Sequence, residues 1–192
     1  MKSKKPAKKK VAAKPAHAKA VPKKSAPAKK SAPGKKGKAL SHIEDYLTDR
    51  KVRYELIRHP KAYTAQEVAA AEHISGKKHV KVVVAQTGAT FVLAALPAAA
   101  RVDFKKLSAV VGKSCSLAKE AALKTLFPDC ELGALPPFGS LYNLPLFADK
   151  LLAQNTEIAF AAGTYTDSLK ISYADFVKLE SPKLADFAQK PK

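Results

Sequence analysis

The sequence predicts an α+β fold, in which one domain holds a mixed, largely antiparallel sheet flanked by helices. First, Val82, Val83 and Val84 form a continuous β-branched run that is typical of a strand buried on both faces. Second, Ser41 with Glu44 has the spacing of a capping box at a helix start, and such signals recur along the chain. Third, the expected helices and strands do not alternate strictly, which favours an α+β arrangement over a regular α/β one.

Residues 1–40 differ in composition from the rest of the chain. They contain fifteen lysines, five prolines and no acidic or aromatic residue, whereas residues 41–192 have a balance of only +4 out of the total net charge of +19. We expect a disordered lysine-rich tail, because such a segment cannot form a core. Its composition resembles the tails of linker histones and bacterial histone-like proteins. This likeness implies contact with nucleic acid through phosphates, and a purely solubilising tail is the alternative.

Five helices are expected, each with a recognisable start or stop. Thr64 and Glu67 form a second capping box, Asp103 and Ser172 are N-cap residues, and Gly112 is a C-terminal stop. The predicted helices are residues 41–50, 64–73, 104–111, 119–126 and 173–179.

The expected strands come from alternating or continuous apolar runs. A turn over residues 86–89 predicts that residues 80–85 and 90–96 form a hairpin. The further predicted strands are residues 53–58, 114–117, 146–149, 157–161 and 169–171. Residues 181–192 are expected to be a frayed C-terminal tail.

Several classes of protein are disfavoured by what the sequence lacks. Cys115 and Cys130 form neither a disulfide framework nor a zinc-binding spacing. There is no apolar run of membrane-spanning length and no secretory signal, so we expect a cytoplasmic protein. Neither the serine nucleophile motif nor a glycine-rich phosphate loop occurs.

Lys81 is the most unusual residue of the predicted core. It opens the apolar run of the central strand. A lysine there either lays its stem along apolar surface with the ammonium in solvent, or holds a fixed cation toward an anionic or carbonyl-bearing ligand. The residues alone leave both interpretations open.

Five segments in order, RHPKAYTAQE, HVKVVV, LAALPAAARVDFKKL, LFPDCELGALPPFG and EIAFAAGTYTDSLKIS, resemble one family. This is the YbaK/prolyl-tRNA-synthetase-associated domain family, the freestanding relatives of the editing domain in bacterial prolyl-tRNA synthetases. The resemblance covers residues 41–180 and implies metal-free, cofactor-free hydrolysis of tRNA that carries a wrong small amino acid.

The resemblance also implies site residues. The lysine on which activity depends corresponds to Lys81, and the Gly-x-x-x-Pro loop that walls the aminoacyl pocket corresponds to Gly133 and Pro137, followed by Gly139. His59 is a candidate pocket residue, with a hydrogen-bonded turn histidine as the alternative. Gly163, where the late loop begins, is a further candidate for contact with substrate. Some alanine-clearing relatives place a histidine in this loop, where this chain reads Gly-Thr-Tyr-Thr, so the amino-acid preference stays open.

Two functional hypotheses follow. In the first, the protein is an aminoacyl-tRNA deacylase that acts in trans, on a proline tRNA among other candidates, and residues 1–40 tether it to nucleic acid. In the second, a degenerate editing fold has no activity and the lysine-rich tail binds nucleic acid. Oligomeric state is not predicted.

Overall fold

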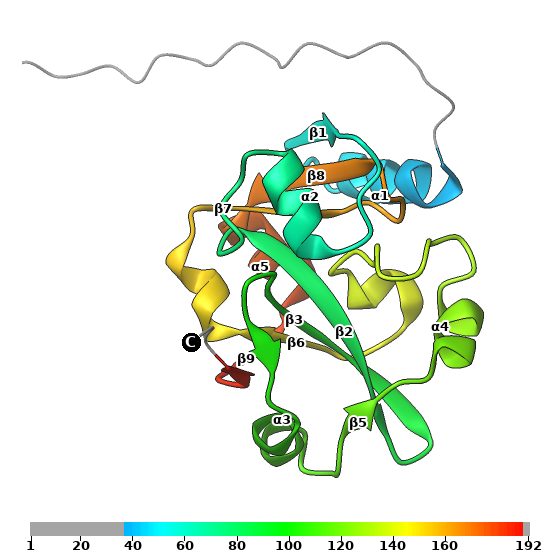
Figure 1. Ribbon diagram of the computed structural model, residues 1–192, viewed down its shortest axis with the longest axis vertical. Coiled ribbons are helices and arrows are strands. Elements are labelled where there is room, and N and C mark those ends of the chain that lie inside the picture. Colours follow the sequence, from blue (N-terminus) through cyan, green and yellow to red (C-terminus); the bar gives the residue numbers. More distant parts are fainter. Residues whose placement is uncertain (1–36, 190–192) are drawn as a thin grey trace, which may run out of the picture. The chain divides into compact units, whose positions relative to one another are not determined.

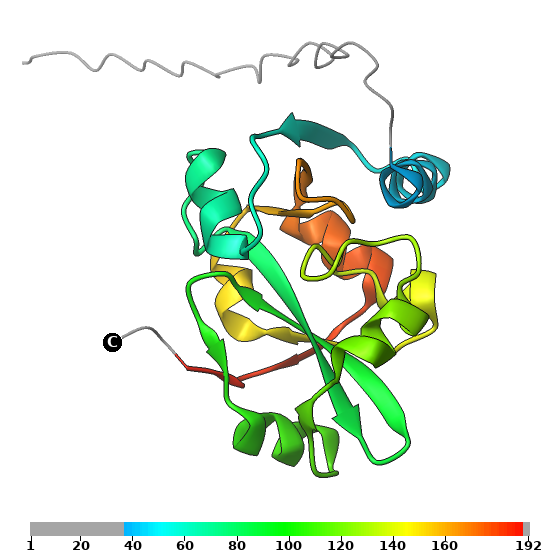
Figure 2. The ribbon, with the colours of Figure 1, turned by 45° about the vertical axis from the view of Figure 1, so that its right-hand side comes forward.

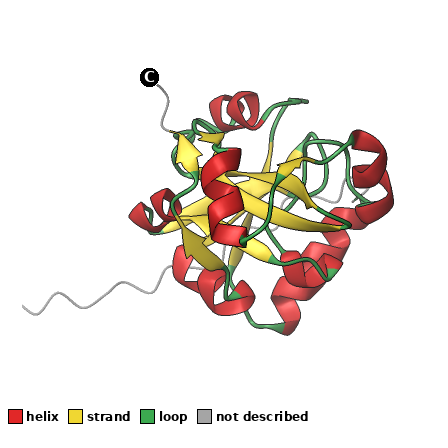
Figure 3. Cartoon of the chain, turned by 90° about the horizontal axis from the view of Figure 1, so that it is seen from below, coloured by secondary structure: helices red, strands yellow, loops and turns green. Residues whose placement is uncertain are grey.

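The computed structural model describes residues 37–189, and within them a mixed sheet is surrounded by five α-helices (Figures 1 and 3). The helices are α1 (Lys38–Asp49), α2 (Ala65–Ala71), α3 (Phe104–Val111), α4 (Glu120–Leu126) and α5 (Tyr173–Glu180). The strands are β1 (Tyr54–Arg58), β2 (His79–Thr87), β3 (Thr90–Pro97), β4 (Arg101–Val102), β5 (Ser116–Leu117), β6 (Leu146–Asp149), β7 (Glu157–Ala161), β8 (Asp167–Ser172), β9 (Lys183–Ala185) and β10 (Ala188–Gln189). Two short 3₁₀ helices, η1 (Gly139–Tyr142) and η2 (Lys150–Gln154), flank β6.

The sheet confirms the predicted α+β class. Its strand order is β1-β8-β7-β2-β3-β6-β9, with β5 paired to β2, and β4 and β10 form a separate two-stranded sheet. The pairs β1–β8, β7–β8, β2–β3 and β2–β5 are antiparallel, whereas β2–β7, β3–β6 and β6–β9 are parallel. The β2–β3 hairpin runs through the middle of the domain (Figures 1 and 2).

The central strand β2 packs against hydrophobic clusters on both of its faces, as the β-branched run predicts. Val82 and Val84 contact the larger cluster, and Val83 and Ala85 contact a second one that includes Leu107. Successive side chains therefore point to opposite faces of a sheet covered on both sides.

Local capping signals place α2 and α3 where the sequence predicts them. Thr64 Oγ1 accepts a hydrogen bond from the Glu67 backbone N–H at 3.2 Å, and the Glu67 carboxylate accepts one from the Thr64 N–H at 3.1 Å. Asp103 caps the start of α3, and Gly112 ends it in the left-handed conformation at φ 78°. Such bonds satisfy backbone groups that a helix end leaves unpaired.

The start of α1 differs from the prediction. The helix begins at Lys38, and its N-cap, Gly37, makes no side-chain capping bond, so Ser41 is not the start signal. Ala39 and Leu40 are fully buried. Burial of these side chains stabilises the additional turn. Residues 1–36 lie outside the described part of the chain, and the disorder expected there stays a prediction.

The prediction of a frayed C-terminal segment is wrong for residues 183–189. β9 pairs with β6 and β10 pairs with β4, and the Phe187 side chain is fully buried. The buried Asp149 carboxylate accepts hydrogen bonds from the backbone N–H groups of Phe187 and Ala188, at 2.8 and 2.7 Å. These contacts fix a segment whose sequence contains no long apolar run. None of the helices in residues 37–189 has the length and apolarity needed to span a bilayer.

Candidate active site around Lys81

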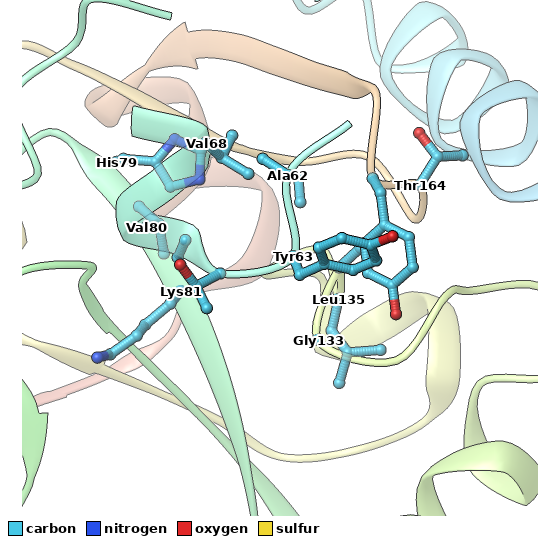
Figure 4. Close-up of a pocket in the computed structure, with 14 residues that line it drawn as sticks. Ala62, Tyr63, Val68, His79, Val80, Lys81, Gly133, Leu135 and Thr164 are labelled. Atoms are coloured by element: carbon cyan, nitrogen blue, oxygen red, sulfur yellow. The ribbon is translucent and has the colours of Figure 1, made fainter. Parts of the chain in front are cut away.

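A pocket lies where the N-terminus of α2, the start of β2 and the loops that follow residues 132 and 161 meet (Figure 4). Each of these four segments is held by backbone hydrogen bonds of its own element or turn. The lining residues are Ala62, Tyr63, Thr64, Ala65, Val68, His79, Val80, Lys81, Gly133, Ala134, Leu135, Ala161, Thr164 and Tyr165. The pocket thus brings together Lys81 and Gly133, which are 52 positions apart in the sequence.

Lys81 is half-buried, and its ammonium donates a hydrogen bond to the carbonyl oxygen of Ala98 at 3.2 Å. Burial lowers the pKa of this ammonium, and the nearby positive charge of Arg101 lowers it further. The side chain extends from β2 away from the ring of Tyr63 (Figure 4). A cation partly removed from water interacts more strongly with a ligand charge than a fully exposed one does.

Gly133 occupies the left-handed region, at φ 88°. A Cβ atom added there would lie 3.6 Å from the Tyr63 carbonyl oxygen, which is an ordinary contact. The backbone conformation, rather than a lack of space, is therefore the reason for glycine at this position. Ala134 and Leu135, which follow it, are buried and hold the loop against the core.

Gly163 does not line the pocket, but it joins the two loops that do. Its N–H donates to the Ala134 carbonyl oxygen at 2.9 Å, and its carbonyl oxygen accepts from the Glu131 N–H at 2.8 Å. These bonds hold Thr164 and Tyr165 beside the Gly133 loop. Gly163 thus connects the two loops, and its expected contact with substrate stays a prediction.

His59 lies beneath the pocket instead of lining it. Its Nδ1 atom is 2.8 Å from the Pro60 carbonyl oxygen, and its Nε2 atom is 3.6 Å from the Glu72 carboxylate. The other Glu72 oxygen is 3.3 Å from Nδ1 of His79, and all three side chains are buried. This cluster links the end of β1, the end of α2 and the start of β2 under the pocket, which agrees with the alternative interpretation of His59 as a turn residue.

Pro137 and Gly139 also lie away from the pocket. Both are buried, and a Cβ atom on Gly139 would lie 2.3 Å from the Leu144 carbonyl oxygen. Gly139 is thus required for close packing of η1 against the segment that follows it. Neither residue lines the pocket, and their predicted contacts with substrate stay predictions.

Other candidate chemistry is disfavoured by its surroundings. Burial raises the pKa of the Cys130 thiol to about 12, so little of it is thiolate near neutral pH. No cluster of three or more His, Cys, Asp or Glu side chains in residues 37–189 has the geometry to hold a metal ion.

Sequence reasoning did not find Glu72, Tyr63 or Tyr165 as residues of this region. The position of His79 beside Lys81 could have been predicted, because residues 79 and 81 of one strand point to the same face of the sheet. The two tyrosines lie in different loops 102 positions apart, and only the folded chain brings them together.

The fold and this pocket are those expected of an editing domain, the class of domain that the sequence resemblance implied. The family model for the aminoacyl-tRNA editing domain matches residues 59–179. Because the match includes most of the described residues, the chain belongs to this family.

Two groups of similar proteins agree with the family. The multifunctional Ser/Thr-tRNA deacylase ProXp-y of Escherichia coli K12 is 38% identical over 98 residues, which are 50% of this chain and 58% of that protein; the O157:H7 protein gives the same values. The match thus spans little more than half the length of these relatives. Among solved structures, a candidate trans-editing enzyme for prolyl tRNA synthetase has TM-score 0.70 and 22% identity over 79% of this chain and 98% of its own. A scaffold protein used for epitope grafting has TM-score 0.72 and 22% identity over 80% and 99%. These structures show the fold.

Proposed function

We propose that the protein is a freestanding aminoacyl-tRNA deacylase that hydrolyses the ester of tRNA charged with a wrong small amino acid. One observation supports this proposal above the others: Lys81 and Gly133, two of the positions that the family resemblance singles out, line the same pocket. Membership of the editing-domain family and the likeness to a named Ser/Thr-tRNA deacylase support it further.

The chemistry suits a pocket with few reactive groups. None of the fourteen lining residues is an Asp, Glu, Ser or Cys, and the His79 ring is buried beside Glu72. An aminoacyl ester is already activated, and the neighbouring ribose hydroxyl can help a water molecule to attack it. Positioning of the ester and stabilisation of the developing negative charge are then the main tasks of the protein.

Lys81 is the group we assign to charge stabilisation. Its ammonium donates a hydrogen bond to the Ala98 carbonyl oxygen. Substrate that offers a phosphate or ester oxygen replaces that neutral partner with a charged or partly charged one, and the interaction strengthens. The same ammonium orients the terminal nucleotide before the reaction.

The preference for a small amino acid is carried over from the family resemblance. Four of the lining residues are alanines, Ala62, Ala65, Ala134 and Ala161, and they give the pocket apolar walls without reactive groups. Thr64 and Thr164 also line the pocket, but their hydroxyl groups are engaged within the protein: Thr64 Oγ1 accepts from the Glu67 N–H, and Thr164 Oγ1 donates to the Asp167 carboxylate. We propose the alanine, serine, cysteine and threonine esters of tRNA as candidate substrates. We also propose that the reaction takes place in the cytoplasm.

The proposal is tested by a deacylation screen with purified full-length protein. tRNAs mischarged with alanine, serine, cysteine or threonine are incubated with it at equal concentrations, beside correctly charged prolyl-tRNA. We expect rapid hydrolysis of at least one mischarged species, little hydrolysis of the correct one, and no loss of rate after dialysis against a strong chelator.

The same screen separates the second hypothesis. A protein that hydrolyses none of these esters, and binds tRNA and duplex DNA with equal affinity, is a nucleic-acid-binding protein and contradicts the proposal. Activity that disappears on chelation and returns with zinc would show a metal-dependent mechanism.

A further inference from the structure

Two tyrosines form an exposed aromatic pair at the pocket. The ring centroids of Tyr63 and Tyr165 are 4.9 Å apart, and the ring planes are inclined by 58°. Tyr63 is 60% exposed, and among residues 37–189 it is one of only four large hydrophobic side chains that are exposed. The core therefore does not explain its position beside the pocket.

The pair is held in place from both sides. The Tyr165 hydroxyl donates a hydrogen bond to the Leu132 carbonyl oxygen at 2.7 Å, and the Tyr165 N–H donates to the Glu131 carboxylate. The Tyr63 N–H donates to the Glu67 carboxylate at 3.1 Å, beside the capping box of α2. Tyr165, held by these hydrogen bonds, thus packs against one side of the Tyr63 ring. The exposed part of the Tyr63 ring is available to a ligand.

A cation accompanies the rings. The Lys61 ammonium lies 5.2 Å from the Tyr63 ring centroid and 5.6 Å from that of Tyr165, within the range of a cation–π contact. Lys61 itself is exposed. An aromatic face beside a positive charge matches a ligand that carries a flat ring and, close to it, an anionic group.

Unpaired nucleotides have this combination. Aromatic side chains stack on single-stranded bases, and lysines neutralise the adjoining phosphates. A base-paired helix does not offer the faces of its bases to a side chain, so an unpaired end is favoured over a duplex.

We propose that Tyr63, supported by Tyr165, stacks an unpaired base at the 3′ end of tRNA and that Lys61 contacts a neighbouring phosphate. The inference rests on the proposed function, because the ester to be hydrolysed is attached to the 3′-terminal ribose and must enter the pocket that Tyr63 borders. It adds a binding site for the nucleotides that lead to that ester.

The test measures binding of the full-length protein to three uncharged RNA hairpins with the same acceptor-stem duplex. One ends in a single-stranded CCA, one is blunt, and one has CCA with abasic residues. We expect Tyr63→Ala to weaken binding of the CCA hairpin roughly ten- to a hundredfold, as loss of one stacked base does. Binding of the blunt and abasic hairpins should not change.

Matched variants identify the physical cause. Tyr63→Phe keeps the ring and should bind like the wild type, whereas Tyr63→Leu keeps apolar area without a π-system and should bind weakly. Leu117→Ala removes another exposed apolar side chain, 65% exposed on β5 and outside the pocket lining, and should have no effect.

Lys61 is tested by salt dependence. Lys61→Ala should reduce the slope of log affinity against log salt by about 0.7 to 0.9, the value for one phosphate contact, and Tyr63→Ala should leave the slope unchanged. The control is Lys113→Ala, which removes an exposed lysine outside the pocket lining.

The outcomes distinguish this inference from the proposed function. If the wild type and Tyr63→Ala bind the CCA, blunt and abasic hairpins equally, the stacking site is wrong, whether or not the protein hydrolyses mischarged tRNA. If Tyr63→Ala selectively weakens CCA binding and no ester is hydrolysed, the stacking site stands and the proposed deacylase activity is wrong.

Discussion

Gly163 lies against Ala39 so closely that a Cβ atom added to Gly163 would be 2.2 Å from the Ala39 Cβ atom. The late loop of the candidate site therefore rests directly on α1, in the part of that helix that begins before the predicted start. The segment that begins at Lys38 thus packs against the late loop of the site.

Gly163→Ala should destabilise the protein by about 2–5 kcal/mol. The left-handed conformation, φ 83°, costs about 1–3 kcal/mol for a residue with a Cβ atom, and the overlap with Ala39 adds an overpacking cost. Equilibrium unfolding in urea measures the change.

Gly112→Ala is the matched control for that variant. Gly112 has a similar φ of 78°, but no atom lies within 4 Å of a Cβ built on it, so it reports the conformational cost alone. Equal effects of the two substitutions would contradict the close contact with Ala39. Ala39→Gly in the Gly163→Ala background should recover part of the difference.

Phe187→Ala should lower the free energy of unfolding by about 3–5 kcal/mol, because it leaves a cavity where a fully buried ring was. Leu184→Ala, in the neighbouring strand β9 and 46% exposed, should cost well under half of that. Chemical denaturation with both variants checks the C-terminal strands, and a Phe187→Ala protein as stable as the wild type would show that this segment does not pack.

The C-terminal strands show what sequence patterns miss. β9 and β10 are three and two residues long, too short for periodicity to be read, and they are fixed by pairing with distant strands and by the Asp149 carboxylate. The capping box at Thr64 and the stop at Gly112 were predictable because all the atoms involved lie within a few residues of each other.

The candidate site was predictable in part. Lys81 and Gly133 follow from the family resemblance, and the structure places both at one pocket. Pro137 and Gly139 belong to the same motif, yet they lie behind the loop, because sequence proximity does not tell which residues of a loop face the substrate. The pairing of Tyr63 with Tyr165 depends on the folded arrangement of two loops.

Deletion of residues 1–36 should leave the domain as stable as the full chain and reduce its affinity for polyanions. The deletion removes fourteen lysines and no acidic residue, which lowers the net charge from +19 to +5. The slope of log affinity for tRNA against log salt should become shallower by several units if a minority of those lysines contact phosphates. An unchanged slope would contradict the tethering role.

A slightly longer deletion is the control. Removal of residues 1–40 also deletes Ala39 and Leu40, which are fully buried, and it should destabilise the domain by about 2–5 kcal/mol, the usual cost of losing one large buried side chain. Thermal unfolding of the two truncated proteins compares them directly.

Lys81→Met should raise the stability of the protein at neutral pH. The pKa of Lys81 is lowered in the folded state, so folding disfavours its protonated form, and a neutral side chain of similar length removes that penalty. The difference in the free energy of unfolding between variant and wild type should be largest at pH values below the lowered pKa. It should disappear as the pH approaches the ordinary lysine value of about 10.5. Unfolding measured from pH 7 to pH 10.5 checks the sign, and a variant that is less stable at pH 7 would contradict it.

Single-turnover hydrolysis of mischarged tRNA by Lys81→Ala tests the account most directly. The substrate is the ester that the wild type hydrolyses fastest, and Lys78→Ala, the loss of an exposed lysine three residues earlier, is the control. We expect the Lys81 variant to keep the wild-type circular dichroism spectrum and to lose about a hundredfold or more in rate, as for the removal of one charge-stabilising donor, while the control retains the wild-type rate. Hydrolysis by folded Lys81→Ala at a rate near that of the wild type would contradict the assignment of this pocket as the active site.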